Sequence, residues 1–487
     1  MIFDNSFFRE MAGFYSTGMP SPVPSPRLVR FNDALAIEIG LDDWTVLPHV
    51  RQATLLSGNE PIEGTAPLAQ AYAGHQFGGF SPSLGDGRAL LLGEVIDRDG
   101  HRRDLAFKGS GRTAYSRGGD GKAALGPMLR EYLIGEAMHG LRIPTSRALA
   151  VVTTGERVIR DRPLPGAVLT RVAASHLRIG TVQYFAARGD LARVRQLVDY
   201  AIARHDPELA GRQDRDFAWL EAVCERQAAL IAQWMNVGFI HGVMNTDNVA
   251  LSGESIDFGP CAFMEVYDPD AVFSSIDSGG RYAYGNQPLI ANWNLARLAE
   301  AMLPLFEAAS PGKAVERASD ILGRFPARYR HHWLRGMRAK LGLIDEAAGD
   351  LEIAERWLHL MFQGRVDFTA GFRALTDAAG GHPQRLRTLL SETDDFDDWW
   401  LQWQVRLRHT PPAAAASRMA LANPVYIARN HKVEEALSAA TERSDLGPFE
   451  RLLEVLQHPF DARPGNESLA EPAPAEVTAC YKTFCGT

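Results

Sequence analysis

The feature that most constrains this chain is the stretch FIHGVMNTDNVALSGESIDFG in its middle, from Phe239 to Gly259. It contains Asn248 and, further on, Asp257, the first residue of the triplet D-F-G. Amide and carboxylate oxygens are hard ligands that suit Mg²⁺ or Mn²⁺. Two protein ligands suffice where the phosphates of a nucleotide complete the coordination shell. The stretch therefore predicts a loop that holds a metal ion against a bound nucleotide.

One part of this loop departs from the usual order of a phosphoryl-transfer site. A protein-kinase catalytic loop reads H-R-D-x-x-x-x-N, in which the aspartate is the base, and D-F-G follows. Here His241 begins the pattern, but Val243 stands in the position of the base and cannot take a proton. Asp247, directly before Asn248, could accept a proton from an attacking hydroxyl. The other interpretation of Asp247 is a short polar side chain that caps the loop.

The chain is strand-rich before this loop and mainly helical beyond Gly180. In the first part, turn residues separate short runs of apolar and β-branched residues. One helix in that part, within 122–141, carries apolar residues at helical spacing and ends at Gly140. The predicted strands are Ala89–Ile96, Asp104–Lys108, 146–154, 156–161 and 166–173, with a turn at Thr154-Gly155, and the long predicted helices are 191–205, 216–238 and 288–309.

This order of elements predicts an α+β chain with a protein-kinase-like two-lobed fold, in which a strand-rich N-lobe precedes a helical C-lobe. We expect an N-terminal extension over 1–65, the N-lobe over 66–170, the C-lobe over 171–408, and a C-terminal extension with a cysteine tail over 409–487. The Pro-rich patch MPSPVPSPRL suggests that the first extension is an extended arm lying on the body. TPPAAAASR near residue 415 and RPGNESLAEPAPAE near residue 470 are interpreted as linkers.

Charge and composition exclude several classes of protein. The chain has 487 residues, 46% hydrophobic and 23% charged, which is ordinary for a globular protein with a large core. Its net charge of −8 argues against a nucleic-acid binder. No apolar run long enough for a membrane span occurs, and the N-terminus lacks the features of a secretory signal or a transit peptide. Four cysteines in so long a chain do not make a disulfide scaffold, so a cytoplasmic location is expected.

A strand-rich lobe that precedes such a metal loop should carry a lysine on a strand and a glutamate on the following helix. Lys108 ends the strand DLAFK, and Glu131 lies within the next helix. A buried lysine needs a carboxylate partner to keep its charge, and a lysine so paired can hold a phosphate. Taken singly, each residue would be interpreted as a solvated surface group. Glu136 on the same helix is a competing partner, but it lies on a different face.

Glycine-rich turns and two arginines add candidate phosphate ligands. GDGR at 85–88 directly precedes the first strand, and GGDGK at 118–122 precedes the helix. Backbone N–H groups exposed by glycine can cradle phosphate oxygens, and the N-terminal end of a helix favours an anion. Arg171 and Arg178 follow in LTRVAASHLRIGT, and a planar guanidinium can clamp a phosphate with two hydrogen bonds. Each feature alone is more often a turn or a surface charge.

Over most of its length, the chain resembles the selenoprotein O family of pseudokinase-fold protein adenylyltransferases. The blocks that carry the resemblance are LAQAYAGHQFGGFSPSLGDGRALLLGE, KGSGRTAYSRGGDGKAALGPMLREYL, TRVAASHLRIGT, HGVMNTDNVALSGESIDFGP and NPVYIARNHKVEEAL. Such long blocks are far more specific than the spacing of the loop alone. The resemblance implies an enzyme that transfers AMP. In the family, ATP lies flipped relative to a kinase, with its γ-phosphate buried and its α-phosphate presented to a protein hydroxyl.

The resemblance also implies a role for individual residues. Asp247 would be the catalytic proton acceptor, and Asn248 and Asp257 would hold Mg²⁺ or Mn²⁺. Glu131 would form a structural ion pair with Lys108. The implied partners are ATP, or UTP with Mn²⁺ as an alternative, and proteins that carry an acceptor hydroxyl on Ser, Thr or Tyr; neither nucleic acid nor a membrane is expected. The residues that would contact the nucleotide are Gly85, Gly87, Arg88, Lys108, Asp120, Gly121, Arg171, Arg178 and Asp257.

Some members of that family carry selenocysteine third from the C-terminus, where this chain has Cys485, with Cys480 five residues earlier. The resemblance implies redox control through this tail, with Cys261 as a partner to test; the alternative is a pair of free thiols.

Two other functions stay open on the residues alone. A small-molecule kinase is disfavoured by Val243 in the position of the base. A non-catalytic scaffold that binds ATP or nothing is disfavoured by an intact Lys108, Asn248 and Asp257, because such a scaffold does not need a full metal site.

Overall fold

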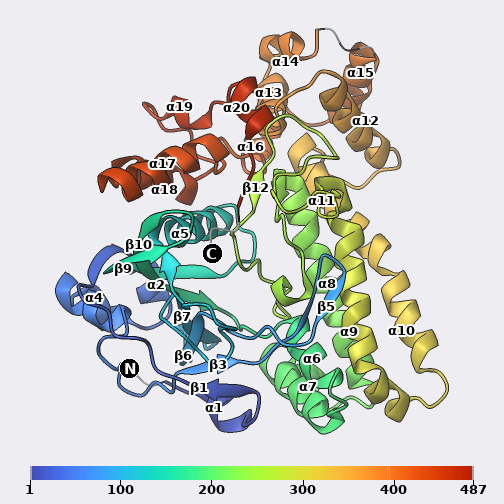
Figure 1. Ribbon diagram of the computed structural model, residues 1–487. Helices are drawn as coiled ribbons and strands as arrows, with labels where there is room; N and C mark the ends of the chain where they lie inside the picture. The colour runs from blue at the N-terminus through green and yellow to red at the C-terminus, as the bar shows by residue number, and fades with distance from the viewer. Residues whose placement is uncertain (1–2, 392, 394, 485–487) are drawn as a thin grey trace.

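The computed structural model describes residues 3–391, 393 and 395–484. Figure 1 shows a mixed α/β chain with a sheet-rich N-terminal region and a helical C-terminal region. The last long helices, α17 and α18, return to the sheet-rich region and pack against its helix α5. In the part of the chain that the structure describes, no helix is long and apolar enough to cross a membrane.

One antiparallel sheet of eight strands forms the N-terminal region. Its order is β1-β3-β6-β7-β10-β9-β2, and the short β8 pairs with β10. Two separate two-stranded ladders pair β4 with β5 and β11 with β12. The strands are β1 Tyr15–Thr17, β2 Arg27–Phe31, β3 Leu68–Gln70, β4 Gly74–Gln76, β5 Gly79–Ser81, β6 Ala89–Ile96, β7 Arg102–Lys108, β8 Ala123–Ala124, β9 Arg147–Ile159, β10 Pro163–Ala173, β11 Phe239–Ile240 and β12 Ala262–Phe263.

The prediction that residues 1–65 form an extended arm is wrong. β1 and β2 are the two edges of the sheet, and β2 pairs with β9. The prolines lie between these strands, where they do not interrupt the pairing of either one. Helices α2 to α4 bury a second apolar core against the sheet, through residues such as Leu35 and Trp44. The helices of this segment are α1 Ser6–Glu10, α2 Asp33–Glu38, α3 Asp42–Thr45 and α4 His49–Leu56.

The strands predicted at 146–154 and 156–161 form the single strand β9. Gly155 has a φ of +78°. Opposite it, the register with β10 shifts between Pro165 and Ala167, so the extra residues bulge out of the ladder and do not reverse the chain. The turn predicted at Thr154-Gly155 is therefore wrong, and the chain reverses at 160–162.

Helix α5 (Leu125–Gly140) covers one face of the sheet (Figure 1). The alternation of side chains along the central strands decides which of their residues face this helix. Successive side chains of a strand point to opposite faces. Phe107 of β7 is part of the core beneath α2 to α4, so Lys108 beside it faces α5. Lys108 pairs with Leu169 of β10, and Arg171, two residues later, lies on the same face. The pleat therefore sets two cations side by side beneath α5.

The long helices expected from the sequence are confirmed. α7 spans the predicted 191–205, and α8 and α9 match 216–238 and 288–309 to within one residue. Gly238 ends α8 in the left-handed conformation that glycine commonly supplies there. The helices of this region are α6 Ile179–Ala186, α7 Leu191–His205, α8 Arg215–Val237, α9 Gln287–Ala309, α10 Ala314–Gly323, α11 Phe325–Leu341, α12 Asp350–Gln363, α13 Phe368–Ala379, α14 Gln384–Leu389, α15 Phe396–Leu407, α16 Pro412–Ala420, α17 Asn430–Arg443, α18 Gly447–Gln457, α19 Glu467–Ala470 and α20 Ala475–Cys480, with 3₁₀ turns η1 Pro207–Leu209, η2 Thr246–Asn248 and η3 Tyr284–Asn286.

The linker predicted near residue 415 is wrong, because this segment forms the helix α16. Pro412 occupies its first turn, and Ala415 and Met419 are buried. Proline is tolerated there because its missing N–H would have no partner within the helix, and the alanines that follow have the highest helix propensity. The second predicted linker contains only the short helix α19 and the start of α20.

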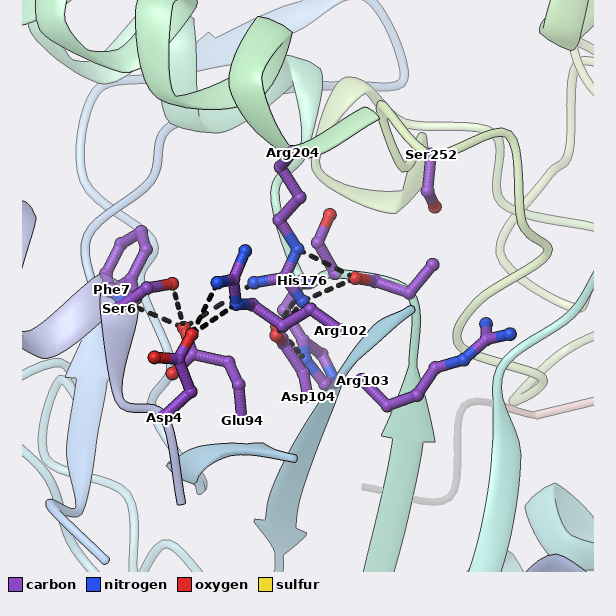
Figure 2. Close-up of polar contacts among 12 residues, drawn as sticks. Asp4, Ser6, Phe7, Glu94, Arg102, Arg103, Asp104, His176, Arg204 and Ser252 are labelled. Atoms are coloured by element: carbon purple, nitrogen blue, oxygen red, sulfur yellow. Dashed lines mark hydrogen bonds and ion pairs between the residues drawn. The ribbon is translucent and has the colours of Figure 1, made fainter. Parts of the chain in front are cut away.

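A buried ion cluster ties the sheet to the helical region (Figure 2). Arg204 of α7 donates to Asp104 of β7 and lies 3.5 Å from Glu94 of β6. The backbone N–H of His176 donates to the same Asp104 over 2.8 Å. Because the loss of one member would leave a buried charge without its partner, this cluster fixes α7 against the two central strands.

Candidate active site

A cavity of about 1380 Å³ is lined by strands of the sheet, by α5 and by the loop between β11 and β12. Every candidate site residue predicted from the sequence lines this one cavity, although these residues are spread along the chain from position 85 to position 257. They are Gly85, Gly87, Arg88, Lys108, Asp120, Gly121, Glu131, Arg171, Arg178, Asp247, Asn248 and Asp257.

Four buried or partly buried charged side chains form a cluster in this cavity. Lys108 Nζ donates to Glu131 Oε2 over 2.5 Å and to Asp257 Oδ1 over 2.7 Å. Arg171 Nη2 lies 2.6 Å from Glu131 Oε1 and donates to Asp257 Oδ1 over 2.8 Å. The two carboxylates are thus shared by the same two cations, so no member of the cluster is isolated.

Glu136, the competing partner for Lys108, lies elsewhere. It accepts two hydrogen bonds from Arg147, over 2.8 and 2.9 Å. The separation follows from helix geometry, since five residues turn a side chain to a different face. The structure therefore brings Glu131, and not Glu136, to Lys108.

Asp257 lies among three cations, because Arg178 Nη2 is 3.9 Å from its Oδ2. Burial would raise the pKa of Asp257, but Arg171, Lys108 and Arg178 hold this pKa well below its usual range. The backbone of Asp257 is left-handed, with a φ of +64°, which is uncommon outside glycine and costs energy. A carboxylate that stays ionised, on a backbone held in this uncommon conformation, is suited to contact a cation.

Arg178 completes the positive end of the cavity. Its guanidinium lies over the ring of Tyr72, 4.4 Å from the ring centroid; Arg178 is buried and Tyr72 is partly buried. Lys108, Arg171 and Arg178 converge on Asp257, and Arg178 also acts on the buried carboxylates of Asp86 and Asp247, whose pKa values it lowers while burial raises them. Cations that converge in this way in a cavity are the kind of environment that can contact the phosphates of a nucleotide.

The glycine-rich turns contribute to the lining of the cavity. A Cβ added to Gly85 would come 2.3 Å from the ring of Tyr115, and one added to Gly121 would come 2.1 Å from the carbonyl oxygen of Gly111. Both glycines have a φ of +67°. Asp120 beside Gly121 is held by Arg160 at 2.9 Å. Gly121 therefore lets two backbone segments pack against each other, and Gly85 leaves room for the ring of Tyr115.

The loop that lacks the kinase base places a different carboxylate, that of Asp247, in the cavity. Asp247 and Asn248 belong to the 3₁₀ turn η2, and Val243 also lines the cavity. Asn248 Nδ2 donates to the carbonyl oxygen of Val243 over 3.0 Å, which leaves its Oδ1 available. Asp247 is 8% exposed, and burial raises its pKa to about 6, although Arg178 and a hydrogen bond from Gln76 act in the opposite direction.

Several residues of the site were missed by the sequence analysis. Tyr72 beneath Arg178 and Gln76 beside Asp247 lie in a block, AYAGHQF, that contains no recognisable ligand spacing. The C-terminal tail also lines the cavity. The N–H of Thr483 donates to the carbonyl oxygen of Phe273 over 2.8 Å, and its hydroxyl donates to the carbonyl oxygen of Pro260 over 2.6 Å. No local pattern could have predicted contacts between segments so far apart.

The redox tail implied by the resemblance is only partly described. Cys485 and the side chain of Cys480 lie outside the described residues. Cys261 is buried, its Sγ lies 3.3 Å from the carbonyl oxygen of Phe258, and burial raises its pKa to about 11. A thiol with a raised pKa is a poor nucleophile. The predicted link between the tail and Cys261 stays a prediction.

Comparison with known proteins identifies the family. Residues 2–457 match the sequence profile of the family described as protein adenylyltransferase SelO. The chain belongs to the SelO family. It is 60% identical over 486 residues to a protein nucleotidyltransferase YdiU of Cereibacter sphaeroides, a match that covers 100% of this chain and 99% of that protein. Proteins of the same name from Chromobacterium violaceum and Rhizobium etli are 58% and 53% identical, over 96% and 100% of this chain and 98% and 97% of their own lengths. The SelO-family chain is accordingly an enzyme, a nucleotidyltransferase.

Proposed function

We propose that this protein transfers AMP from ATP to a hydroxyl group of Ser, Thr or Tyr in a protein and releases pyrophosphate. The proposal rests on one observation about the loop. Val243, at the position of the kinase base, is apolar, and four residues later the buried carboxylate of Asp247 lines the cavity. The sheet-rich and helical regions are consistent with a kinase-like fold. In the proposed reaction, the nucleotide is bound in the direction opposite to that in a kinase.

The distribution of charge supports that direction. Lys108, Arg171 and Arg178 are buried and lie together around Asp257. If the β- and γ-phosphates enter first, these cations contact them, and the α-phosphate remains nearer to Asp247. A γ-phosphate held inside would leave a base at position 243 without a function, which accounts for the valine.

The transfer then needs one base and one stabilised leaving group. The acceptor oxygen attacks the α-phosphorus and forms the new P–O bond, while the bond from that phosphorus to the oxygen bridging to the β-phosphate breaks. The hydroxyl proton passes to a carboxylate oxygen of Asp247, and the electron pair of the broken bond leaves on pyrophosphate. Arg171 and Arg178, at the β/γ end, would stabilise the charge that develops on that leaving group.

The residues of the loop fit a divalent cation. Asn248 has an amide Oδ1 that is not engaged by its own side-chain hydrogen bond, and Asp257 is an ionised carboxylate in the same cavity. Both are hard oxygen donors of the type that Mg²⁺ and Mn²⁺ prefer. When bound, such a cation would neutralise part of the phosphate charge, and Asn248 and Asp257 would hold it.

One incubation tests the proposal. The protein is mixed with a divalent cation and with ATP labelled on either the α- or the γ-phosphate, and label on protein is counted. We expect label from the α position alone. Label from γ alone would mean that the protein is a kinase, and no label from either position would favour a non-catalytic scaffold. α-labelled UTP with Mn²⁺ in a parallel reaction decides between transfer of AMP and transfer of UMP.

A further inference from the structure

The hairpin of β4 and β5, 74–81, is bound to the loop that carries the proposed base. This hairpin is not part of the main sheet. The N–H of His75 donates to Thr246 Oγ1 over 2.7 Å, and the N–H of Phe77 donates to Asn245 Oδ1 over 3.2 Å. The backbone on either side of residue 76 is therefore fastened to the two residues that precede Asp247.

Gln76, between these two anchors, reaches the carboxylate itself. Its Nε2 donates to Asp247 Oδ2 over 3.3 Å, and this is the one side-chain hydrogen bond to Asp247 among the residues that the structure describes. The other oxygen, Oδ1, is buried and has no hydrogen-bond partner there. It packs against Gly74, where an added Cβ would come within 2.4 Å of it. Oδ2 is thus the oxygen that can meet a substrate.

A carboxylate oxygen has two lone pairs and can accept two hydrogen bonds. Gln76 uses one of them, and because Gln76 and Asp247 both line the cavity, the second is left for an acceptor hydroxyl that enters it. A neutral amide can hold the carboxylate without adding a charge beside it. Gln76 itself is solvent-exposed, so its position depends on the anchored backbone of the hairpin and not on burial.

From these contacts we infer that Gln76 is a positioning residue for nucleotide transfer: its amide fixes the carboxylate of Asp247 in the orientation that receives the acceptor proton. The inference rests on the proposed function, because it assigns Gln76 a role that only a reaction with Asp247 as base requires. Gln76 does not need to touch the nucleotide for this role, so its loss should lower the rate of transfer and leave ATP binding unchanged.

The test compares the full-length protein with Gln76→Met, which keeps the shape of the side chain and removes the donor. The measurements are the turnover of α-labelled ATP onto the chain itself and onto dephosphorylated casein, the Kd for ATP, and the melting temperature. We expect about a 10-fold fall in turnover at saturating ATP, with Kd and melting temperature unchanged. Gln76→His, which restores an N–H donor, should recover most of the rate. Ser83→Ala, in the segment that follows the hairpin, is the matched control.

A double-mutant cycle separates positioning from a merely structural role. If Gln76 acts through Asp247, the substitution Gln76→Met should cause no further loss in an Asp247→Asn background, because coupled residues are not additive. Three outcomes would overturn the inference. The first is an equal loss of rate in both backgrounds, and the second is a loss explained by weaker ATP binding or by unfolding. The third is a wild-type rate in Gln76→Met. If the wild-type protein itself transfers no α-label, the proposed function fails, and the role of Gln76 fails with it; this outcome is recognised without any variant.

Discussion

Glu131 accepts a hydrogen bond from Lys108 over 2.5 Å, and Lys108 in turn donates to Asp257. Helix α5 and the loop after β11 are therefore linked through one ammonium group. The pleat of β7 turns Lys108 towards α5, and the helical turn brings Glu131 to it. Because of this link, the buried ammonium group of Lys108 has two carboxylate partners in the cavity.

The two glutamates of α5 provide a matched pair of variants. Glu131→Gln removes the charge that Lys108 and Arg171 share, so both cations would be drawn to Asp257 alone, and we expect transfer to fall by about 10-fold, or about 1.4 kcal/mol. Glu136→Gln weakens the contacts with Arg147 and Gln457, which lie outside the site. We expect its transfer rate per folded molecule to stay at the wild-type level, while its free energy of unfolding falls by about 3 kcal/mol. Turnover assays and urea unfolding of both variants measure these effects. Equal losses of activity would contradict the assignment.

Asp257→Ala should abolish transfer. The substitution removes a proposed metal ligand and leaves three cations without the carboxylate that lies among them. The variant is expected to bind ATP even in a buffer without divalent cation, because the cations remain, but adding Mg²⁺ or Mn²⁺ should no longer tighten that binding. Calorimetric titration with and without the metal measures this. A metal response equal to that of the wild type would show that Asp257 is not a ligand.

Asp247→Ala should remove most of the transfer and largely spare ATP binding. In the proposed reaction, Asp247 receives the acceptor proton and the phosphates contact other residues. A loss of about 100-fold or more is in the range seen when a general base is removed. The rate of α-label transfer and the Kd for ATP are measured in parallel. A wild-type rate in this variant would mean that another group takes the proton.

The pH dependence of stability should depend on Glu254, which accepts hydrogen bonds from the N–H of Ala174 and the hydroxyl of Ser252. Burial raises the pKa of Glu254 to about 7, above its ordinary value of 4.5. Between these two values the folded state holds more protons than the unfolded state, so the contribution of this group to stability falls as pH rises through the window.

Glu254→Gln removes this titration, because glutamine stays neutral. We expect the variant to be more stable than the wild type at pH 8 and to lose less stability between pH 5 and pH 8. Urea unfolding at the two pH values measures the difference, with Glu63→Gln at an exposed position as the control. The same loss of stability in wild type and Glu254→Gln would contradict the prediction.

The elements with a clear local pattern were predicted well. The helix α7 matches its expected range, because apolar residues at helical spacing and an aspartate N-cap mark its bounds within fifteen residues of sequence. The segment before β3 was predicted poorly. Its prolines indicate an irregular arm, but β2 forms by pairing with β9, more than a hundred residues away, and no local signal reports such a partner.

The sequence by itself determined which residues stand in the loop: the spacing of Asn248 and Asp257 and the valine at 243 are local facts, and from them a metal site without the usual base was predicted. Only the tertiary structure decided that Glu131 meets Lys108, that Arg178 lies over Tyr72, and that Gln76 holds Asp247. The physical reason is that these contacts join segments brought together by the sheet and by the packing of helices around it. Hydrogen bonds between distant segments depend on that packing and leave no periodic trace along the chain.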